Sequence, residues 1–246
     1  MAGLDWLSAR PIAHRGLHGE GLIENTLGAA AAAVAGNYGI EVDLQLAADG
    51  EVVVFHDDTL DRLTSGTGPV NARSLAELKA LSLRATSERI PTLQELLARV
   101  AGRTPLMLEL KSQWNGDDRL AARLAAELMS YAGPVAAMSF DPDLVMALIK
   151  HAPGLPRGIV AERHFRKSEW PQLSLVRRLA LGHLLHMYAT KPHFIAYRVD
   201  DLPALAPLFC RHVWGMPILT WTVRSEAQRR RARWWANQVI FEGFRP

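Results

Sequence analysis

Short apolar segments alternate with longer segments of helical periodicity along the whole chain. The segments expected to form strands are residues 11–14, 40–44, 106–110, 135–139, 158–161, 194–198, 217–221 and 238–242. The expected helices are residues 26–35, 92–100, 118–131, 142–151, 169–187, 202–209 and 225–236. Strands that alternate with helices predict a largely parallel sheet. Eight such strands fit a TIM (β/α)8 barrel, an α/β fold, better than an open sheet.

Two segments depart from a regular barrel. Residues 45–90 are too long for one loop, and the turn Ala48-Asp49-Gly50 before a β-rich run at 51–55 predicts a hairpin on the second strand. We expect the rest, at about residues 57–90, to be a small insertion over the barrel mouth, with a short helix near 75–81. After the last strand only a few residues remain before Pro246, which predicts a truncated C-terminal helix. We therefore expect one domain over residues 1–246.

The composition is that of an ordinary globular protein. Of the 246 residues, 49% are hydrophobic and 22% are charged, which predicts a sizeable core and excludes a disordered chain. The net charge of +3 is compatible with an anionic substrate but does not identify one. The single cysteine, Cys210, cannot form an intramolecular disulfide and is expected to be a buried small hydrophobe. Without a secretory signal at the start or an apolar run long enough to cross a bilayer, we expect a cytoplasmic protein with no stable membrane insertion.

Acidic residues occupy one face of two expected core strands. Glu41 and Asp43 are two residues apart, so on a strand they share a face, with roughly 6.6 Å of rise between them. Glu109 and Lys111 repeat this spacing on the third barrel strand. The four side chains could form an internal salt-bridge layer. However, three acids against one lysine leave a charge deficit that a divalent metal such as Mg²⁺ or Ca²⁺ would fill.

Two histidines and two cations complete a set that suits phosphate chemistry. His14 and Arg15 end the first strand, and His56 follows the hairpin strand. Each histidine alone is more readily explained as structural, but two imidazoles beside the acids can serve as general acid and general base near neutral pH. Arg15 and Lys111 suit a phosphate group. The combination predicts a metal-dependent hydrolase with phosphoryl chemistry.

The motifs occur in the order of a known family. They are His14-Arg15-Gly16, Glu24-Asn25-Thr26, Glu41-x-Asp43, His56-Asp57-x-Thr59-Leu60-x-Arg62 and Glu109-x-Lys111, and they resemble those of glycerophosphodiester phosphodiesterases. Beyond Lys111 the resemblance continues weakly at Ser139-Phe140 and Trp221-Thr222-Val223. It implies a TIM barrel with a small insertion after the second strand. It also implies hydrolysis of glycerophosphodiesters, such as glycerophosphocholine, to glycerol 3-phosphate and an alcohol.

The resemblance also implies a role for each candidate residue. The implied roles are an acid/base pair of His14 and His56, metal ligands Glu41, Asp43 and Glu109, phosphate-binding Arg15 and Lys111, and pocket residues Asn25 and Trp221. One histidine would take a proton from the glycerol 2-hydroxyl, whose attack gives a cyclic phosphate that water then opens, and the other would protonate the leaving alkoxide. The sequence does not assign the two histidines, the metal, the alcohol or the oligomeric state.

Some features leave alternatives open. The last strand ends at Glu242, where the family commonly shows an aspartate-proline pair and a further helix, so Glu242 either reaches the site or lies at its rim. A lysophospholipase D-like or phosphoinositide phospholipase-like enzyme and a non-catalytic binding barrel are the alternative functions. The basic and aromatic segment 229–235 could contact nucleic acid or an anionic membrane. We favour a solvated arginine face with tryptophans that pack inward or cover the unclosed end of the barrel, and expect no nucleic-acid partner.

Overall fold

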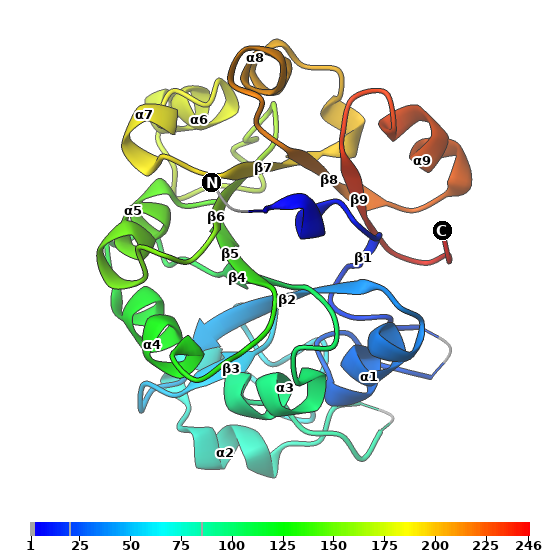
Figure 1. Cartoon of the computed structure of the whole chain (residues 1–246). Coiled ribbons are helices and arrows are strands. Elements are labelled where there is room, and N and C mark those ends of the chain that lie inside the picture. Colours follow the sequence, from blue (N-terminus) through cyan, green and yellow to red (C-terminus); the bar gives the residue numbers. More distant parts are fainter. Residues whose placement is uncertain (1–2, 20, 85) are drawn as a thin grey trace.

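Eight parallel strands close into a barrel in the computed structural model, which describes residues 3–19, 21–84 and 86–246 (Figure 1). The strands are β1 (Ile12–Ala13), β2 (Gly39–Leu46), β4 (Leu106–Leu110), β5 (Val135–Ser139), β6 (Arg157–Ala161), β7 (Phe194–Arg198), β8 (Ile218–Val223) and β9 (Gln238–Phe241). The barrel closes because β1 pairs with both β2 and β9. The predicted (β/α)8 barrel is therefore confirmed.

Helices surround the barrel in Figure 1. They are α1 (Leu27–Ala35), α3 (Leu93–Val100), α4 (Arg119–Leu128), α5 (Pro142–His151), α6 (Leu175–Gly182), α7 (Met187–Thr190), α8 (Leu205–Trp214) and α9 (Glu226–Ala232). Local side-chain hydrogen bonds fix several helix starts. At α3, for example, Thr92 accepts from the backbone N–H of Glu95 while the Glu95 side chain accepts from that of Thr92, a capping box. Cys210 on α8 is buried, as expected.

Two of the predicted helices differ most in extent from the structure. The single helix expected at 169–187 is interrupted, because α6 starts only after the cap Ser174 and ends at Gly182. A Cβ on Gly182 would lie 2.5 Å from the backbone oxygen of Arg163, so the loop that precedes α6 packs against the helix end. The helix expected at 202–209 instead runs from Leu205 to Trp214 and ends at Gly215, which adopts the left-handed conformation.

The segment between β2 and α3 forms the expected hairpin and short helix. Strand β3 (Val52–Val54) pairs antiparallel with β2, and the turn η2 (Val70–Ala72) and helix α2 (Leu75–Ala80) follow. These elements have a core of their own that includes Phe55, Leu60, Leu78 and Ile90. In Figure 1 they lie beside α3, outside the barrel wall. After β9, residues 242–246 contain no helix.

The barrel interior is apolar at one end and polar at the other. The short helix η1 (Asp5–Leu7) lies across the end nearer the viewer in Figure 1. Its Leu7 is buried and belongs to a cluster with Met107, Phe194 and Leu219 inside the barrel. The polar side chains gather at the opposite end, where the parallel strands have their carboxyl ends, and barrel enzymes carry their sites there. Among the described residues, no helix is long and apolar enough to cross a membrane.

A histidine whose ring nitrogens are buried, directly before α7, makes the fold sensitive to acid. Neither ring nitrogen of His186 has a hydrogen-bond partner, and burial lowers its pKa from 6.5 to about 4. Between these values the unfolded chain binds a proton that the folded chain does not, so the free energy of unfolding decreases as the pH falls. The loss from this group reaches about 3 kcal/mol near pH 4.

Replacement of His186 by leucine is expected to remove this loss. Chemical denaturation at pH 7 and near pH 4.5 should show the variant losing less stability than the wild type on acidification. The matched control is His183→Leu, because His183 is exposed. Parallel losses in the wild type and His186→Leu would mean that His186 takes up its proton in the folded state.

Candidate active site

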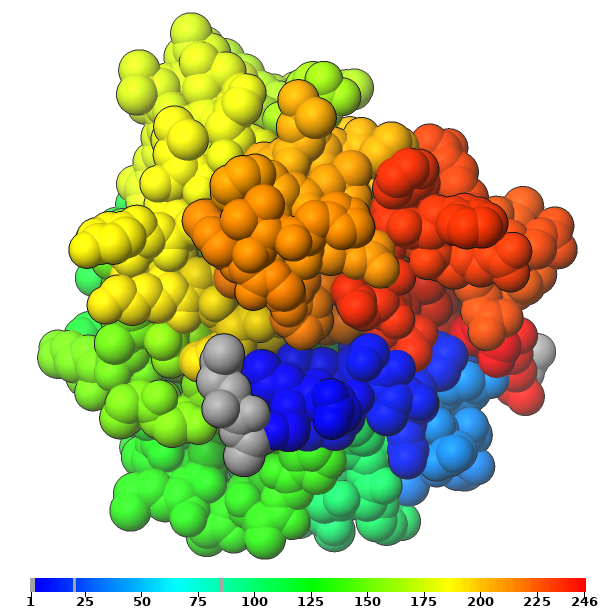
Figure 2. Space-filling model, turned by 45° about the horizontal axis from the view of Figure 1, so that its top comes forward, coloured from blue at the N-terminus to red at the C-terminus, as the bar shows by residue number. Residues whose placement is uncertain are grey.

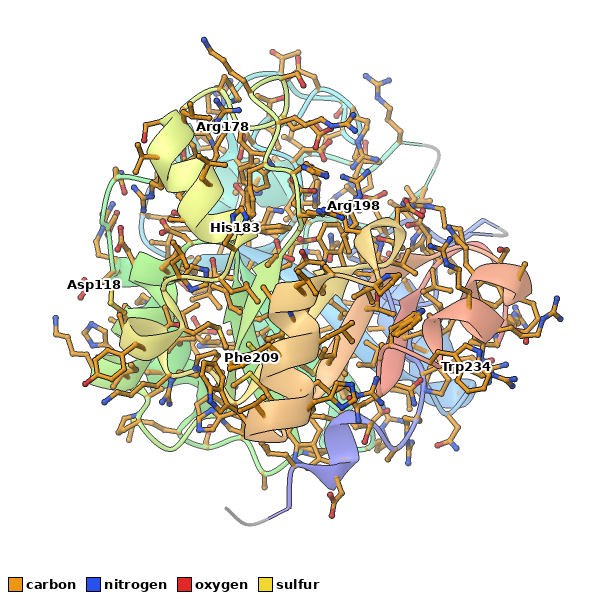
Figure 3. All side chains as sticks on the ribbon, turned by 90° about the horizontal axis from the view of Figure 1, so that it is seen from above. Asp118, Arg178, His183, Arg198, Phe209 and Trp234 are labelled. Carbon is orange, nitrogen blue, oxygen red and sulfur yellow. The ribbon has the colours of Figure 1, made fainter. Side chains whose placement is uncertain are left out.

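A pocket of about 520 Å³ opens at the carboxyl ends of the barrel strands. It brings together eight of the nine candidate residues: His14, Arg15, Glu41, Asp43, His56, Glu109, Lys111 and Trp221. Asn25 lies behind Asp43 rather than in the pocket wall. Arg198, at the end of β7, also lines the pocket, and Figure 3 shows it at the end of the barrel opposite η1.

Three carboxylates form the floor of this pocket. One oxygen from each of Glu41, Asp43 and Glu109 lies within 4.8 Å of the others, and the residues are only 2%, 2% and 8% exposed. Glu41 Oε2 accepts a hydrogen bond from the backbone N–H of Arg15 at 2.9 Å, but the buried Glu41 Oε1 has no partner. Burial and the neighbouring Asp43 and Glu109 carboxylates raise the pKa of Glu41 well above its usual value. An unpaired buried carboxylate oxygen is costly unless a cation occupies the space in front of it.

Lys111 compensates only part of this negative charge. Its Nζ donates to Glu109 Oε1 at 3.1 Å and lies 3.4 Å from Asp43 Oδ1. Burial alone would lower the pKa of Lys111, because it favours the neutral amine. The ion pairs with Glu109 and Asp43 outweigh this effect and raise the pKa of Lys111 above its usual value. The salt-bridge layer considered from the sequence therefore accounts for Asp43 and Glu109 but leaves Glu41 uncompensated. The oxygen donors fit a hard divalent cation such as Mg²⁺ or Ca²⁺.

Asn25 fixes the position of Asp43. Its amide nitrogen donates to Asp43 Oδ2 at 2.9 Å, and its Oδ1 accepts from the backbone N–H of Asp43 at 3.2 Å. Asn25 has φ 58°, a left-handed conformation that asparagine tolerates better than most residues. Its predicted role in binding substrate stays a prediction, and its contacts are those of a residue that orients a carboxylate.

The loop after β1 presents Arg15 to the same cluster. Arg15 has φ 55°, and its Nη1 donates to Glu24 at 2.7 Å while its Nε lies 3.5 Å from Asp43 Oδ2. Gly16 follows with φ 79°, and a Cβ there would lie 2.9 Å from the Cβ of Ala29 on α1. Glycine at this position lets the loop pack against the helix while the guanidinium reaches the pocket.

Each candidate histidine has a carboxylate within hydrogen-bond distance of its Nδ1 atom. His14 Nδ1 lies 3.0 Å from Glu242 Oε2, and His56 Nδ1 lies 2.7 Å from Asp57 Oδ1. The hydrogen bond with His14 lowers the pKa of Glu242 to about 2, so this carboxylate is ionised near neutral pH and acts as an acceptor. A proton on Nδ1 of each ring then leaves Nε2 available for chemistry. His14 Nε2 lies 3.9 Å from Glu41 Oε2, beside the carboxylate cluster.

A chain of ion pairs connects Arg15 with the second histidine. Glu24 accepts from Arg15 and from Arg62 Nη2, the latter at 2.7 Å, and Arg62 Nε donates to Asp57 at 2.6 Å. Asp57 in turn holds His56. The sequence-based prediction missed Glu24, Asp57 and Arg62 as site residues, although all three stand within the motifs that carry the family resemblance.

Three other pocket residues were not among the nine candidate residues. Glu162 directly follows β6, and Arg198 is the last residue of β7. Arg198 Nη1 donates to Glu162 at 2.9 Å. Trp170, from the loop before α6, donates its ring N–H to the same carboxylate at 2.8 Å and packs against Phe140. The signal that could have identified Glu162 and Arg198 was the position of polar residues at the carboxyl ends of barrel strands.

The chain resembles known proteins over most of its length. The model of the glycerophosphoryl diester phosphodiesterase family matches residues 14–242. A glycerophosphodiester phosphodiesterase of Bacillus subtilis is 30% identical over 227 residues, which cover 83% of this chain and 73% of that protein. A phosphodiesterase of Oleispira antarctica, solved in complex with its product sn-glycerol-3-phosphate, superposes with a TM-score of 0.79 at 23% identity and covers 96% of this chain and 94% of that one.

The solved glycerophosphodiester phosphodiesterase of Thermotoga maritima has the same fold. Its TM-score is 0.72 at 23% identity, with 94% of this chain and 92% of that chain covered. The resemblance stated from the sequence motifs is thus confirmed over nearly the whole barrel. The chain belongs to the glycerophosphoryl diester phosphodiesterase family and is a phosphoric diester hydrolase.

Proposed function

We propose that this chain hydrolyses glycerophosphodiesters to glycerol 3-phosphate and an alcohol, with Glu41, Asp43 and Glu109 as the ligands of a divalent cation. The observation that carries the proposal is the buried Oε1 atom of Glu41, which has no hydrogen-bond partner. The lysine beside this cluster, Lys111, pairs with Glu109. Members of the family generally use a divalent metal. The all-oxygen donor set favours Mg²⁺ or Ca²⁺. A bound cation of this kind would withdraw charge from the phosphoryl oxygens.

Arg15 and Lys111 bind and orient the phosphodiester. Both line the pocket beside the carboxylate cluster, and ion pairs with Asp43 hold both side chains in place. Arginine offers a planar set of N–H donors to two phosphate oxygens, and lysine adds a compact charge. Positioning the substrate beside two histidines is itself a large part of catalysis.

His14 and His56 move the protons. With its Nδ1 proton directed to a carboxylate, each ring can accept or donate a proton at Nε2. One ring takes the proton of the glycerol 2-hydroxyl as that oxygen attacks phosphorus, and the P–O bond to the alcohol breaks as the other ring protonates the departing oxygen. Water then opens the cyclic phosphate to glycerol 3-phosphate. A phosphodiester bound between two such histidines needs no further proton donor.

The pocket favours a polar alcohol over a long acyl chain. Besides the candidate residues, its wall contains the ionisable side chains of Glu162, Glu169, Arg198, Asp200 and Arg224. Burial of an acyl chain against these groups would remove their hydration without replacing their hydrogen bonds. The same wall also carries the apolar side chains of Phe140, Trp170 and Trp221, so the lysophospholipase-like alternative is separated by comparing substrates.

Assays with two substrates test this preference. Purified protein with Mg²⁺ or Ca²⁺ should hydrolyse glycerophosphocholine with a kcat/KM at least about tenfold above that for lysophosphatidylcholine, a difference of about 1.4 kcal/mol in transition-state stabilisation. EDTA should abolish both activities. Equal or reversed kcat/KM values would contradict the assignment of substrate class, and full activity in EDTA would contradict the metal site. The cytoplasmic location stays a prediction.

Glu242 is expected to act as a positioning residue for His14. Glu242→Gln keeps the side-chain shape but removes the charge that stabilises a protonated imidazole, and its amide can reverse the hydrogen bond to Nδ1. We expect kcat to fall by about 10–100-fold while KM changes less than about threefold. Steady-state kinetics on glycerophosphocholine measure both, and Glu226→Gln on α9 is the matched control. A raised KM with an unchanged kcat would place Glu242 in substrate binding at the rim instead.

A further inference from the structure

The outer face of α8 carries an apolar stripe that no other part of the described chain covers. Leu205, Phe209 and Val213 are spaced by four residues and are 91%, 54% and 59% exposed. This spacing places them along one side of a helix. The stripe continues at Trp214, which is 56% exposed and contacts Phe209 edge-on with ring centroids 5.5 Å apart. Large exposed apolar patches mark interaction surfaces more often than isolated exposed residues do.

Helix α9 and the turn after it extend this surface. Figure 2 shows α8 and α9 next to each other on the outside of the molecule. Arg211 of α8 donates to the backbone oxygen of Trp234 at 3.3 Å, and Arg231 of α9 donates to that of Leu202 at 3.1 Å. Trp234 is 69% exposed, and Figure 3 labels it next to α9, to one side of α8 and its Phe209. Of the two tryptophans of this segment, Trp235 packs against the core as expected, whereas Trp234 does not pack inward.

We define the α8–α9 face by these apolar residues and by the arginines that surround them. Its members are Leu205, Phe209, Val213 and Trp214 of α8, and Arg230, Arg233 and Trp234 of the α9 segment. Within the described residues, no carboxylate pairs with Arg211, Arg230 or Arg233. The guanidinium of Arg233 instead lies over the ring of Trp234, 5.3 Å from the ring centroid.

The charge of the chain is strongly uneven. Residues 163–238 contain thirteen lysines and arginines against four acidic residues, whereas the remainder contains fifteen against twenty-one. The small net charge of +3 therefore combines a basic segment that includes α6 to α9 with an acidic remainder that includes the carboxylate cluster. A basic surface with exposed aromatic and aliphatic side chains has the chemistry of a bilayer interface with anionic headgroups.

We propose that the α8–α9 face binds the surface of an anionic lipid bilayer. Phe209, Trp214 and Trp234 would enter the headgroup region, where aromatic rings are favoured, and Arg230 and Arg233 would contact lipid phosphates. The barrel would lie on its side against the membrane, since α8 runs along the barrel wall (Figure 3). This contact is peripheral and concerns a surface outside the catalytic pocket, so it does not depend on the proposed substrate.

Two other partners fit this face less well. A second copy of the chain in a two-fold dimer would place the unpaired arginines of one face against those of the other, which is unfavourable. Nucleic acid would satisfy the arginines but would leave the Leu205, Phe209 and Val213 stripe without an apolar partner. A bilayer satisfies both the charge and the apolar surface.

Sedimentation with lipid vesicles tests the proposal on the full chain. Vesicles of phosphatidylcholine with added phosphatidylglycerol should bind the protein at least about tenfold more strongly than vesicles of phosphatidylcholine alone, and high salt should release it. The double variant Phe209→Gln/Trp234→Gln and the double variant Arg230→Gln/Arg233→Gln should each weaken binding at least about tenfold. Both should retain wild-type hydrolysis of a water-soluble glycerophosphodiester, which shows that they fold.

The matched control residues lie outside the basic segment 163–238. Met129→Gln removes an apolar side chain that is 88% exposed, and Arg99→Gln removes an exposed arginine of α3. Neither should change vesicle binding. Equal binding of the wild type and both double variants overturns the proposal. So does a dimer in solution that dissociates in these variants, or binding to double-stranded DNA under conditions in which anionic vesicles are not bound.

Discussion

His56→Ala is expected to lower kcat for glycerophosphocholine by about 10²–10⁴-fold, and His14→Ala is expected to do the same. Each histidine lines the pocket and has its Nδ1 engaged with a carboxylate, so each imidazole is oriented to exchange a proton at Nε2. Alanine at either position removes one of the two proton-transfer steps. Single-turnover and steady-state kinetics at saturating divalent cation measure the loss.

The control for this pair is His183→Ala, which removes an exposed histidine that lies outside the pocket and should leave kcat unchanged. Thermal unfolding of all three variants shows whether they are folded. A change in KM alone, with kcat kept in either pocket variant, would exclude that histidine from proton transfer. The double variant should lose little more than the worse single variant, because residues that act in one reaction sequence are not additive.

Glu41→Gln is expected to weaken divalent-cation binding by more than about 100-fold. Even the loss of a residue that only orients a metal ligand lowers metal affinity by about 10–100-fold. The local fold should survive, because the amide oxygen of the variant side chain can still accept from the backbone N–H of Arg15. In the absence of metal, the variant should be at least as stable as the wild type, because it removes a buried negative charge beside Asp43 and Glu109. Calorimetric titration and melting temperatures with and without cation give both results.

A matched control for Glu41 is Glu127→Gln on α4. Glu127 also has a buried carboxylate oxygen without a partner, and burial raises its pKa, but it lies outside the pocket. Its replacement should leave the cation-induced rise in melting temperature unchanged. If Glu41→Gln bound cation as tightly as the wild type, the unpaired oxygen would need another explanation.

The barrel strands could be predicted because each is a short apolar run whose burial does not depend on distant partners. Strands β4 (Leu106–Leu110) and β7 (Phe194–Arg198), for example, have the predicted bounds. The predicted helix boundaries were less accurate, because several local signals compete to define where a helix begins and ends. Gly215 is a left-handed helix end that the sequence displays, yet the expected helix stopped at Phe209. The loop before α6 depends on tertiary contacts of Phe165 and Trp170 with Phe140, which no local pattern reveals.

The same distinction applies to the site. Glu41 and Asp43 could be identified because their spacing on one strand is a local property with a high cost of burial. The role of Glu242 could not, because its contact with His14 spans 228 residues of sequence and exists only once the barrel closes. Asn25 was assigned to the pocket by resemblance, and only its two hydrogen bonds to Asp43 reveal that it lies behind a carboxylate.

The carboxylate cluster can be tested most directly by crystallography with Mn²⁺, which takes the oxygen ligands of Mg²⁺ and Ca²⁺ and scatters anomalously. We predict an anomalous peak within coordinating distance of carboxylate oxygens from Glu41, Asp43 and Glu109, and no such peak in crystals of Glu41→Gln. A peak instead at either of the two other donor sets among the described residues would contradict the assignment; these sets are His14, His18 and Glu242, and Glu24, His56 and Asp57. The same would follow if crystals of active, Mn²⁺-saturated protein showed no peak at the three carboxylates.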